Sequence, residues 1–435
     1  MKIEKICEEH IKPSSPTPLK LRNHKISFID EIIPNSSIPL ILFYNKNETI
    51  TQSEMCSHLK TSLSQILTQF YPLAGRMSSQ YSIDCNDQGV YYAEVKVDIS
   101  LLDIIKFPKS NELVQLTPYN SDGTISNFQE LLAIQVNLFT CGGMAISVSI
   151  SHKIGDASSL CTFIKNWCNT SEELRSNKKV IKDSIFISLS SFFPPREIVH
   201  NVMPSEKCVA IEPVVEKVVV KRFIFTASNI VKMKTKVINS GYNNERVTRV
   251  EVITALLWKC FMAAKGCNSI AILPVNIRKK IVPPLPENSF GNFFLVSSAI
   301  GNVENEWFSL VGKIKNVIER IDGNYAEKIR GENGFEFVMS NFNQVGKLLS
   351  QGDDIKVLRI GSWCNFPING VNFGWGESIL AIVAILGVKD HIVLLDSLKY
   401  SGGIEAWVVM ADQEMELFEQ DKELKDFTSL DVSLL

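Results

Sequence analysis

Met144-Ala-Ile-Ser-Val-Ser-Ile-Ser-His-Lys-Ile-Gly-Asp156 combines a strand, a tight turn and a helix start in one continuous segment. Apolar residues alternate with serines up to Ser151, which is typical of a strand, and His152 continues the apolar face. Gly155 permits a turn, and Asp156 takes the N-cap position of a helix with an apolar stripe. A histidine at such a position is partly shielded from water yet accessible to a substrate, which suits a general base near neutral pH. Taken alone, the pattern also fits a core histidine and a plain helix cap.

A second informative stretch, Val371-Asn-Phe-Gly-Trp-Gly376, lies far downstream and precedes an apolar run. It lacks the third glycine of a dinucleotide-binding fingerprint, so it is not a Rossmann loop. His152-x-x-x-Asp156 and Asn372-Phe373-Gly374-Trp375-Gly376 together resemble the HxxxD and DFGWG signatures of the plant BAHD acyltransferases. The resemblance spans essentially the whole chain, and its branch looks like that of vinorine synthase, deacetylvindoline acetyltransferase and the acylsugar acyltransferases. Further matching segments are Ile11-Lys-Pro-Ser-Ser-Pro-Thr-Pro18, Tyr71-Pro-Leu-Ala-Gly-Arg76, Asn276-Ile-Arg278, Pro283-Pro-Leu-Pro286, Gly291-Asn292 and Ser362-Trp-Cys364.

Composition is that of an ordinary globular protein, with 435 residues, 45% hydrophobic and 21% charged. The formal net charge of -2 gives no reason to expect a nucleic-acid or membrane-surface partner. The N-terminal segment from Met1 to His10 is too charged for a secretory signal, so we expect a cytoplasmic protein. The longest apolar run, Ile379 to Val388, is too short to span a membrane. We expect the protein to act as a monomer.

Cysteine and histidine spacing argues against a metal site. There is no C-x-x-C among the 10 cysteines, and the six histidines are scattered, none of them paired at ligand spacing. Buried reduced thiols are therefore the expected state of the cysteines. We expect neither a metal nor a permanently bound cofactor.

Helix and strand signals are interleaved along both halves of the chain, which predicts an α/β fold. Thr51-Gln-Ser-Glu54 and Thr248-Arg-Val-Glu251 are capping boxes at helix starts. The resemblance implies two chloramphenicol acetyltransferase-like domains, each a mixed sheet with flanking helices, joined by a long crossover. The predicted domains are residues 1-180, carrying HxxxD, and 216-435, carrying NFGWG, with the crossover at 181-215. Strand-like runs occur at 90-97, 131-138, 145-150, 270-275, 293-300, 379-386 and 392-395.

Catalytic roles follow only from the resemblance. It implies that His152 is the general base that deprotonates an acceptor hydroxyl. It implies that Asp156 points away from substrate and supports the His152 turn by pairing with Arg278. Trp363 is a candidate oxyanion donor through its indole N–H, and plain packing is an equal alternative.

The chain departs from the family pattern at two positions. Asn372 replaces the aspartate of DFGWG, which puts in doubt any ion pair made there. The rest of that motif (Phe373, Gly374, Trp375 and Gly376) is expected to be architectural. Asn365 stands where several relatives carry an arginine.

The expected substrates are an acyl-CoA, with acetyl-CoA as the expected donor, and a small-molecule alcohol. Candidate CoA contacts are Lys279, Lys280, Gly291 and Asn292, although a lysine pair is more often a solvated face. We predict an acyl-CoA-dependent O-acyltransferase acting on a plant alkaloid, terpenoid or acyl sugar. Two alternatives stay open: a CoA-independent condensation or cyclisation enzyme using the same histidine, and a catalytically weak binding paralogue.

Overall fold

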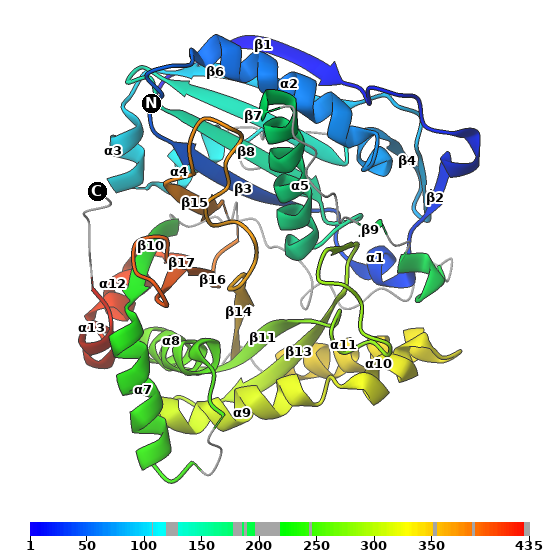
Figure 1. Ribbon diagram of the computed structural model, residues 1–435. Helices are drawn as coiled ribbons and strands as arrows, with labels where there is room; N and C mark the ends of the chain where they lie inside the picture. Colours follow the sequence, from blue (N-terminus) through cyan, green and yellow to red (C-terminus); the bar gives the residue numbers. More distant parts are fainter. Residues whose placement is uncertain are drawn as a thin grey trace. The chain divides into compact units, whose positions relative to one another are not determined.

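The computed structural model describes residues 1–106, 108–118, 129–176, 185–186, 189–195, 218–242, 246–350, 355–384 and 388–429. The chain divides into two compact units (Figure 1). Unit 1 comprises residues 1–203, 286–293 and 366–386, and unit 2 comprises 204–285, 294–365 and 387–435. The predicted crossover at 181-215 lies largely outside the described residues.

Unit 1 is built on a six-stranded mixed sheet in the order β1-β6-β7-β8-β3-β15. The β6–β7 pair is parallel, and the other neighbouring pairs are antiparallel. Helices α2 and α5 lie side by side on one face of this sheet in Figure 1, joined by a hydrogen bond from Trp167 Nε1 to Ser62 Oγ. The strands are β1 (Ile3–Ile11), β3 (Ser37–Tyr44), β6 (Val90–Val97), β7 (Leu132–Phe139), β8 (Met144–Ser151) and β15 (Leu380–Val383). The helices are α1 (Phe28–Ile32), α2 (Gln52–Leu67), α3 (Leu101–Lys106), α4 (Ser110–Gln115) and α5 (Ala157–Ser176).

Smaller elements complete unit 1. A three-stranded sheet has the order β2-β5-β4, and a parallel pair joins β12 to β9. The strands are β2 (Asn23–Lys25), β4 (Arg76–Ser79), β5 (Ser82–Asp84), β9 (Ile185–Phe186) and β12 (Ser289–Phe290). The short 3-10 helices are η1 (Leu19–Leu21), η2 (Tyr71–Ala74) and η3 (Leu189–Ser191).

Two segments that the sequence placed in the C-terminal domain belong to unit 1. Residues 286–293 and 366–386, which include the NFGWG motif, cluster with the N-terminal unit. Strand β15 pairs antiparallel with β3 and so completes the first sheet at its edge, with Ala381 opposite Leu42. The local apolar pattern predicted the strand correctly, but it carried no information about which sheet the strand would join.

Unit 2 has its own six-stranded mixed sheet, in the order β10-β17-β16-β14-β11-β13. The pairs β14–β16 and β11–β14 are parallel, and the rest are antiparallel. The strands are β10 (Val218–Phe225), β11 (Asn268–Asn276), β13 (Phe294–Gly301), β14 (Ile355–Ser362), β16 (His391–Asp396) and β17 (Ile404–Ala411). The helices are α7 (Ala227–Asn239), α8 (Arg249–Lys265), α9 (Trp307–Glu319), α10 (Gly323–Arg330), α11 (Gly334–Ser350), α12 (Asp412–Gln420) and α13 (Lys422–Phe427).

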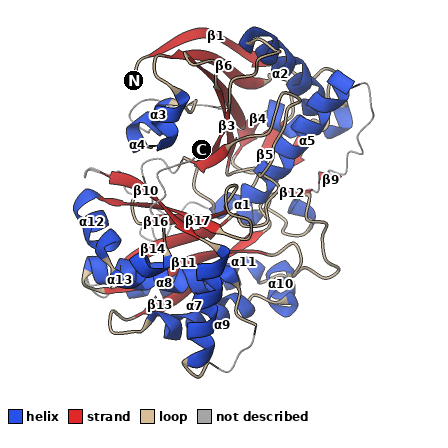
Figure 2. Ribbon diagram, turned by 60° about the vertical axis from the view of Figure 1, so that its left-hand side comes forward, coloured by secondary structure: helices blue, strands red, loops and turns tan. Residues whose placement is uncertain are grey.

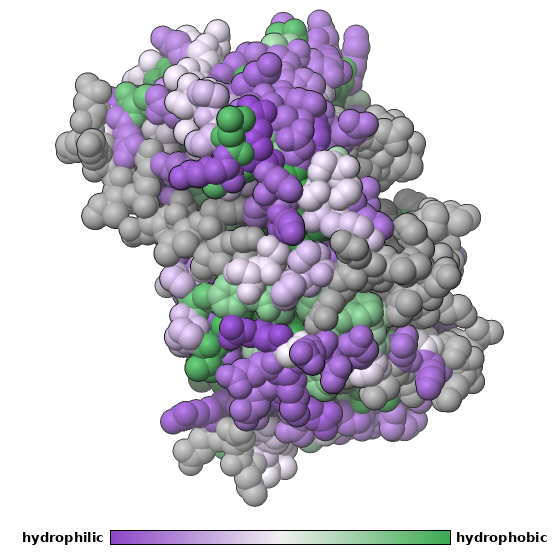
Figure 3. Space-filling view, turned by 90° about the vertical axis from the view of Figure 1, so that its right-hand side faces the viewer, coloured by the Kyte–Doolittle hydropathy of each residue, from purple (hydrophilic) through white to green (hydrophobic). Residues whose placement is uncertain are grey.

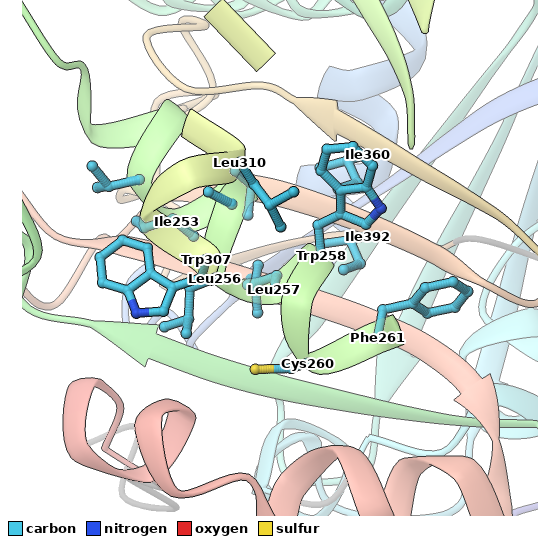
Figure 4. Close-up of a cluster of buried hydrophobic side chains, with 14 of the residues drawn as sticks. Ile253, Leu256, Leu257, Trp258, Cys260, Phe261, Trp307, Leu310, Ile360 and Ile392 are labelled. Carbon is cyan, nitrogen blue, oxygen red and sulfur yellow. The ribbon is translucent and has the colours of Figure 1, made fainter. Parts of the chain in front are cut away.

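Helix α8 is the centre of the unit 2 core. Figure 2 shows α7, α8 and α9 gathered on one face of the second sheet. Trp258 of α8 and Trp307 of α9 are fully buried there, together with Ile360 and Ile392 from the sheet (Figure 4). An α-helix buried nearly all round needs apolar residues on most faces, and from Val252 to Met262 only Thr254 and Lys259 of α8 are polar.

Both capping boxes found in the sequence are confirmed. The Thr51 side chain accepts from Glu54 N and the Thr248 side chain from Glu251 N, with each glutamate bonding back to the N-cap N–H. These bonds satisfy backbone donors that a helix start otherwise leaves unpaired, and fix where α2 and α8 begin.

The surface is mostly hydrophilic on the face in Figure 3, with hydrophobic residues in small groups. Scattered exposed apolar side chains of this kind are normal for folded domains. Among the described residues, no helix is long and apolar enough to cross a membrane. The same residues contain no group of three or more His, Cys, Asp or Glu side chains placed to hold a metal ion.

Candidate active site

His152 lies one residue past the end of β8, in a tight turn. Its backbone N–H donates to Ser36 O at 2.8 Å, and Ile154 N donates to Ser151 O at 3.1 Å to close the turn. The side chain keeps part of its surface exposed. Burial lowers the pKa of His152 below its ordinary value, and the negative charge of Asp156 opposes that shift. The imidazole is therefore biased toward the neutral form, which a general base requires.

Asn292 bonds directly to the His152 ring. His152 Nδ1 lies 3.2 Å from Asn292 Oδ1. The Asn292 Nδ2 group donates at 2.7 Å both to the backbone carbonyl of His152 and to Asp30 Oδ1. Asn292 is fully buried, and both the oxygen and the nitrogen of its amide take part in these contacts.

Gly291 is likewise bound into unit 1. Its N–H donates to Ser159 Oγ at 2.9 Å, and Ser159 Oγ donates back to the Gly291 carbonyl at 2.8 Å. The CoA contacts predicted for Gly291 and Asn292 stay predictions. The structure uses both residues to attach the segment after β12 to the start of α5.

Asp156 caps helix α5, as the sequence predicted. Its Oδ1 accepts from Ser159 N at 2.8 Å and its Oδ2 accepts from Phe293 N at 3.1 Å. The carboxylate is buried, with 6% of its surface exposed. One side chain thus joins the helix start to the segment that carries Asn292, and this supports a structural role for Asp156.

Arg278 and Trp363 belong to unit 2, and their predicted roles stay predictions. The Arg278 guanidinium is almost fully buried and bonds to Asn276 Oδ1 through Nη1 at 3.3 Å. Trp363 is also buried, and its backbone N–H donates to Leu394 O at 2.8 Å. Lys279 is exposed, whereas Lys280 donates to the Ile318 carbonyl at 3.4 Å and burial lowers its pKa.

Asn372 performs a capping task inside the NFGWG turn. Its Oδ1 accepts from Gly374 N at 2.7 Å and from Gly376 N at 3.1 Å. Both glycines have positive φ, +105° and +128°, so the turn requires residues without a side chain at these positions. An aspartate oxygen could accept the same two bonds, which explains why asparagine can stand at this position.

The NFGWG turn is fixed to α5 and to the loop before α2 through its backbone and its rings. The carbonyls of Phe373, Gly374 and Trp375 accept from Ser171, Arg175 and Asn47. The rings of Phe373 and Trp375 are stacked on each other, and Phe373 contacts Trp167 edge-on. These contacts support an architectural role for the motif.

Asp30 is a site residue that the sequence analysis missed. It lies on α1, it is 4% exposed, and burial raises its pKa to about 6, with hydrogen bonds from Asn292 and Ser27 opposing the shift. Lys153, next to His152, donates through Nζ to the Asp30 and Glu31 carbonyls at 3.1 Å. The Ser27-x-x-Asp30 pattern signals a helix start, but nothing local to it indicates the contact with Asn292.

Comparison with known proteins identifies the family. A model of the Transferase family matches residues 1–425. The chain belongs to this family, that of the plant BAHD acyltransferases. One BAHD relative, stemmadenine O-acetyltransferase of Catharanthus roseus, is 31% identical over 430 residues, covering 96% of each chain.

Two solved structures have a similar fold. Vinorine synthase has a TM-score of 0.80 and 29% identity, over 99% of this chain and 100% of its own. The F. sporotrichioides protein TRI101, complexed with coenzyme A and T-2, has a TM-score of 0.69 at 11% identity, over 94% and 99% of the two chains. These likenesses confirm the predicted chloramphenicol acetyltransferase-like α/β fold, and the family shows that this chain is an acyltransferase.

Proposed function

We propose that this BAHD enzyme transfers an acyl group, acetyl as the expected one, from acyl-CoA to a hydroxyl group of a small plant specialised metabolite. The observation that carries the proposal is the state of His152. It is partly exposed, its pKa is lowered by burial, and its Nδ1 is engaged by Asn292. A base held in one orientation and kept neutral meets the requirements of general-base catalysis.

The proposed reaction proceeds without a covalent acyl-enzyme. His152 Nε2 takes the hydroxyl proton as the acceptor oxygen attacks the thioester carbonyl carbon. A new C–O bond forms, and the carbonyl oxygen becomes an oxyanion, for which Trp363 is the candidate donor. The intermediate collapses with cleavage of the C–S bond, and the imidazolium gives its proton to the CoA thiolate, so that the products are an ester and free CoA.

Asn372 no longer favours the reading of the chain as a weak binding paralogue. That reading depended on the loss of an aspartate from DFGWG. In the structure the asparagine oxygen accepts two backbone hydrogen bonds that a carboxylate would accept. The substitution preserves the turn and lies outside the His152 network.

The test is an incubation of the purified protein with radiolabelled acetyl-CoA and a pooled plant extract, followed by identification of the labelled product. We expect a labelled ester from the parent protein and from His10→Ala, a control at an exposed histidine whose ring bonds to Glu130. His152→Ala should give almost no labelled ester. Equal labelling by the His152→Ala protein would overturn the proposed function.

A further inference from the structure

A buried carboxylate is linked to the proposed base through one intervening side chain. Asp30 Oδ1 accepts from Asn292 Nδ2 at 2.7 Å, and Asn292 Oδ1 lies 3.2 Å from His152 Nδ1. The chain Asp30–Asn292–His152 is thus continuous through two hydrogen bonds. All three residues belong to unit 1, although they come from α1, from the segment after β12 and from the turn after β8.

The direction of these hydrogen bonds is fixed by chemistry. Asn292 Nδ2 faces two acceptors, a carboxylate oxygen of Asp30 and the backbone carbonyl of His152. The amide nitrogen must therefore point toward them, which turns Oδ1 toward the imidazole. Because an amide oxygen only accepts, Nδ1 of the neutral ring must carry the hydrogen. The lone pair then lies on Nε2, the nitrogen that has to take the hydroxyl proton.

Helix α1 is held in a way that keeps Asp30 in position. Asp30 Oδ2 accepts from both the backbone N–H and the hydroxyl of Ser27 at 2.7 Å, in a capping box. At the other end of this short helix, Lys153 Nζ donates to the carbonyls of Asp30 and Glu31. The residue that follows the proposed base thus ties its turn to the helix that carries the carboxylate.

Asp156, the aspartate of the HxxxD motif, makes different hydrogen bonds from those of Asp30. The two carboxylate oxygens of Asp156 accept from the backbone N–H groups of Ser159 and Phe293. Those bonds stabilise a helix start and a loop, and they do not set the tautomer of the imidazole. The residue that orients a catalytic histidine in a triad is a hydrogen-bonded acceptor at Nδ1, and here Asn292 occupies that place with Asp30 behind it.

We propose that Asp30, acting through Asn292, is the positioning carboxylate of His152. It fixes the tautomer with Nδ1–H and stabilises the imidazolium that forms when Nε2 takes the hydroxyl proton. No proton moves to Asn292 or Asp30 in this step. The inference rests on the proposed role of His152 as the base.

The test compares the parent with Asp30→Asn and with Glu31→Gln, a matched loss of charge from the same helix. Asp30→Asn should lower kcat roughly ten- to a hundredfold, with little change in KM for acetyl-CoA, because a displaced base loses its alignment. Glu31→Gln should stay within about twofold of the parent, since it leaves the hydrogen bonds from Asp30 to Asn292 and from Asn292 to His152 in place.

The pH profile separates positioning from simple structural damage. The charges that act on His152 are those of Asp156 and Lys153 on its own segment, while Asp30 and Glu31 on α1 face Lys153, and Asp30 is also linked to His152 through Asn292. Removing the negative charge of Asp30 destabilises the imidazolium, so the acid limb of kcat/KM should move to lower pH. Damage to folding alone would lower the amount of active protein without moving that midpoint.

Should Asp30→Asn fail to fold, Asn292→Ser gives the same two readouts at the middle link between Asp30 and His152. The double variant should be no slower than Asn292→Ser alone, because both changes break one connection. Unchanged kcat and an unchanged acid midpoint in folded Asp30→Asn or Asn292→Ser protein would overturn the inference. If His152→Ala also retained transfer, the proposed function would fail as well, whereas an inactive His152→Ala protein would confine the failure to Asp30.

Discussion

The two ends of helix α5 differ in what is packed against them. At its N-terminal end, Asp156, Ser159 and the turn of His152 form a polar network with Asn292 and the buried carboxyl of Asp30. At its C-terminal end, the NFGWG turn is held by Ser171 and Arg175 and by stacked aromatic rings.

This contrast indicates which end of α5 can take part in acid–base catalysis. Acid–base chemistry near neutral pH needs titratable groups with shifted pKa values, and such groups lie at the N-terminal end. The contacts described at the C-terminal end join Ser171 and Arg175 to backbone carbonyls of the NFGWG turn and stack its aromatic rings, so they hold the turn that precedes β15.

Replacement of Asp156 should have the largest effect on stability. Asp156→Ala removes a helix cap, worth about 0.5–2 kcal/mol, and leaves the Phe293 N–H without this acceptor, at about 1–3 kcal/mol. Thermal melting should show an earlier midpoint together with lost activity. Asp156→Asn, which keeps an oxygen for the cap, should lose less. An unchanged midpoint for Asp156→Ala would refute its structural role.

At the opposite end of α5, Gly374→Ala should lower stability while sparing the chemistry. The backbone at Gly374 has φ +105°, and an added Cβ would lie 2.7 Å from Arg175 Cδ. We expect a loss of about 1–3 kcal/mol, the usual cost of a strained backbone conformation, with kcat per folded molecule within a few-fold of the parent. Gly370→Ala, at φ +68° with nearest contacts of 3.6 Å, is the milder control. A fall in kcat per folded molecule well beyond a few-fold would show that the NFGWG motif takes part in the reaction.

The pH dependence of activity should reflect the protonation of His152, which lies at the N-terminal end of α5. Burial lowers the pKa of His152, so the neutral base persists below pH 6.5 and kcat/KM should fall only as the pH drops through that lowered pKa. The expected limb has a slope of about tenfold per pH unit for one essential group. A midpoint above 6.5 in the kcat/KM profile would contradict the environment described for His152.

Asn372→Asp should have the smallest effect. The carboxylate can accept the bonds that the amide oxygen accepts from Gly374 and Gly376, so stability should change by at most about 1 kcal/mol. Activity per folded molecule should stay within a few-fold. A hundredfold gain in kcat with unchanged melting would show that position 372 takes part in the reaction.

Local features of the site could be read from the sequence. The alternation before His152 predicted β8, and the cap at Asp156 predicted the start of α5, because both patterns depend only on neighbouring residues. The family resemblance likewise anticipated the fold. The role of Asn372 inside its own turn is local too, although the sequence left open whether the turn would tolerate it.

The long-range contacts could not be read in the same way. Apolar spacing marks Leu380–Val383 as a strand but does not select β3 as its partner. Nothing near Asp30 indicates that it will lie beside Asn292, since the two are far apart in the chain and meet only in the folded unit. For the same reason, nothing in the sequence indicated that Gly291 would bond to Ser159 or that Asn292 would bond to His152.

The most direct test of the account is the rate of acyl transfer by His152→Ala at saturating acetyl-CoA, with melting and acetyl-CoA affinity measured on the same preparation. We predict that kcat falls by roughly 10²–10⁴, the usual contribution of a general base, while the melting midpoint and the affinity stay close to those of the parent. Near-full transfer by the folded variant would show that His152 is not the base and would contradict the account.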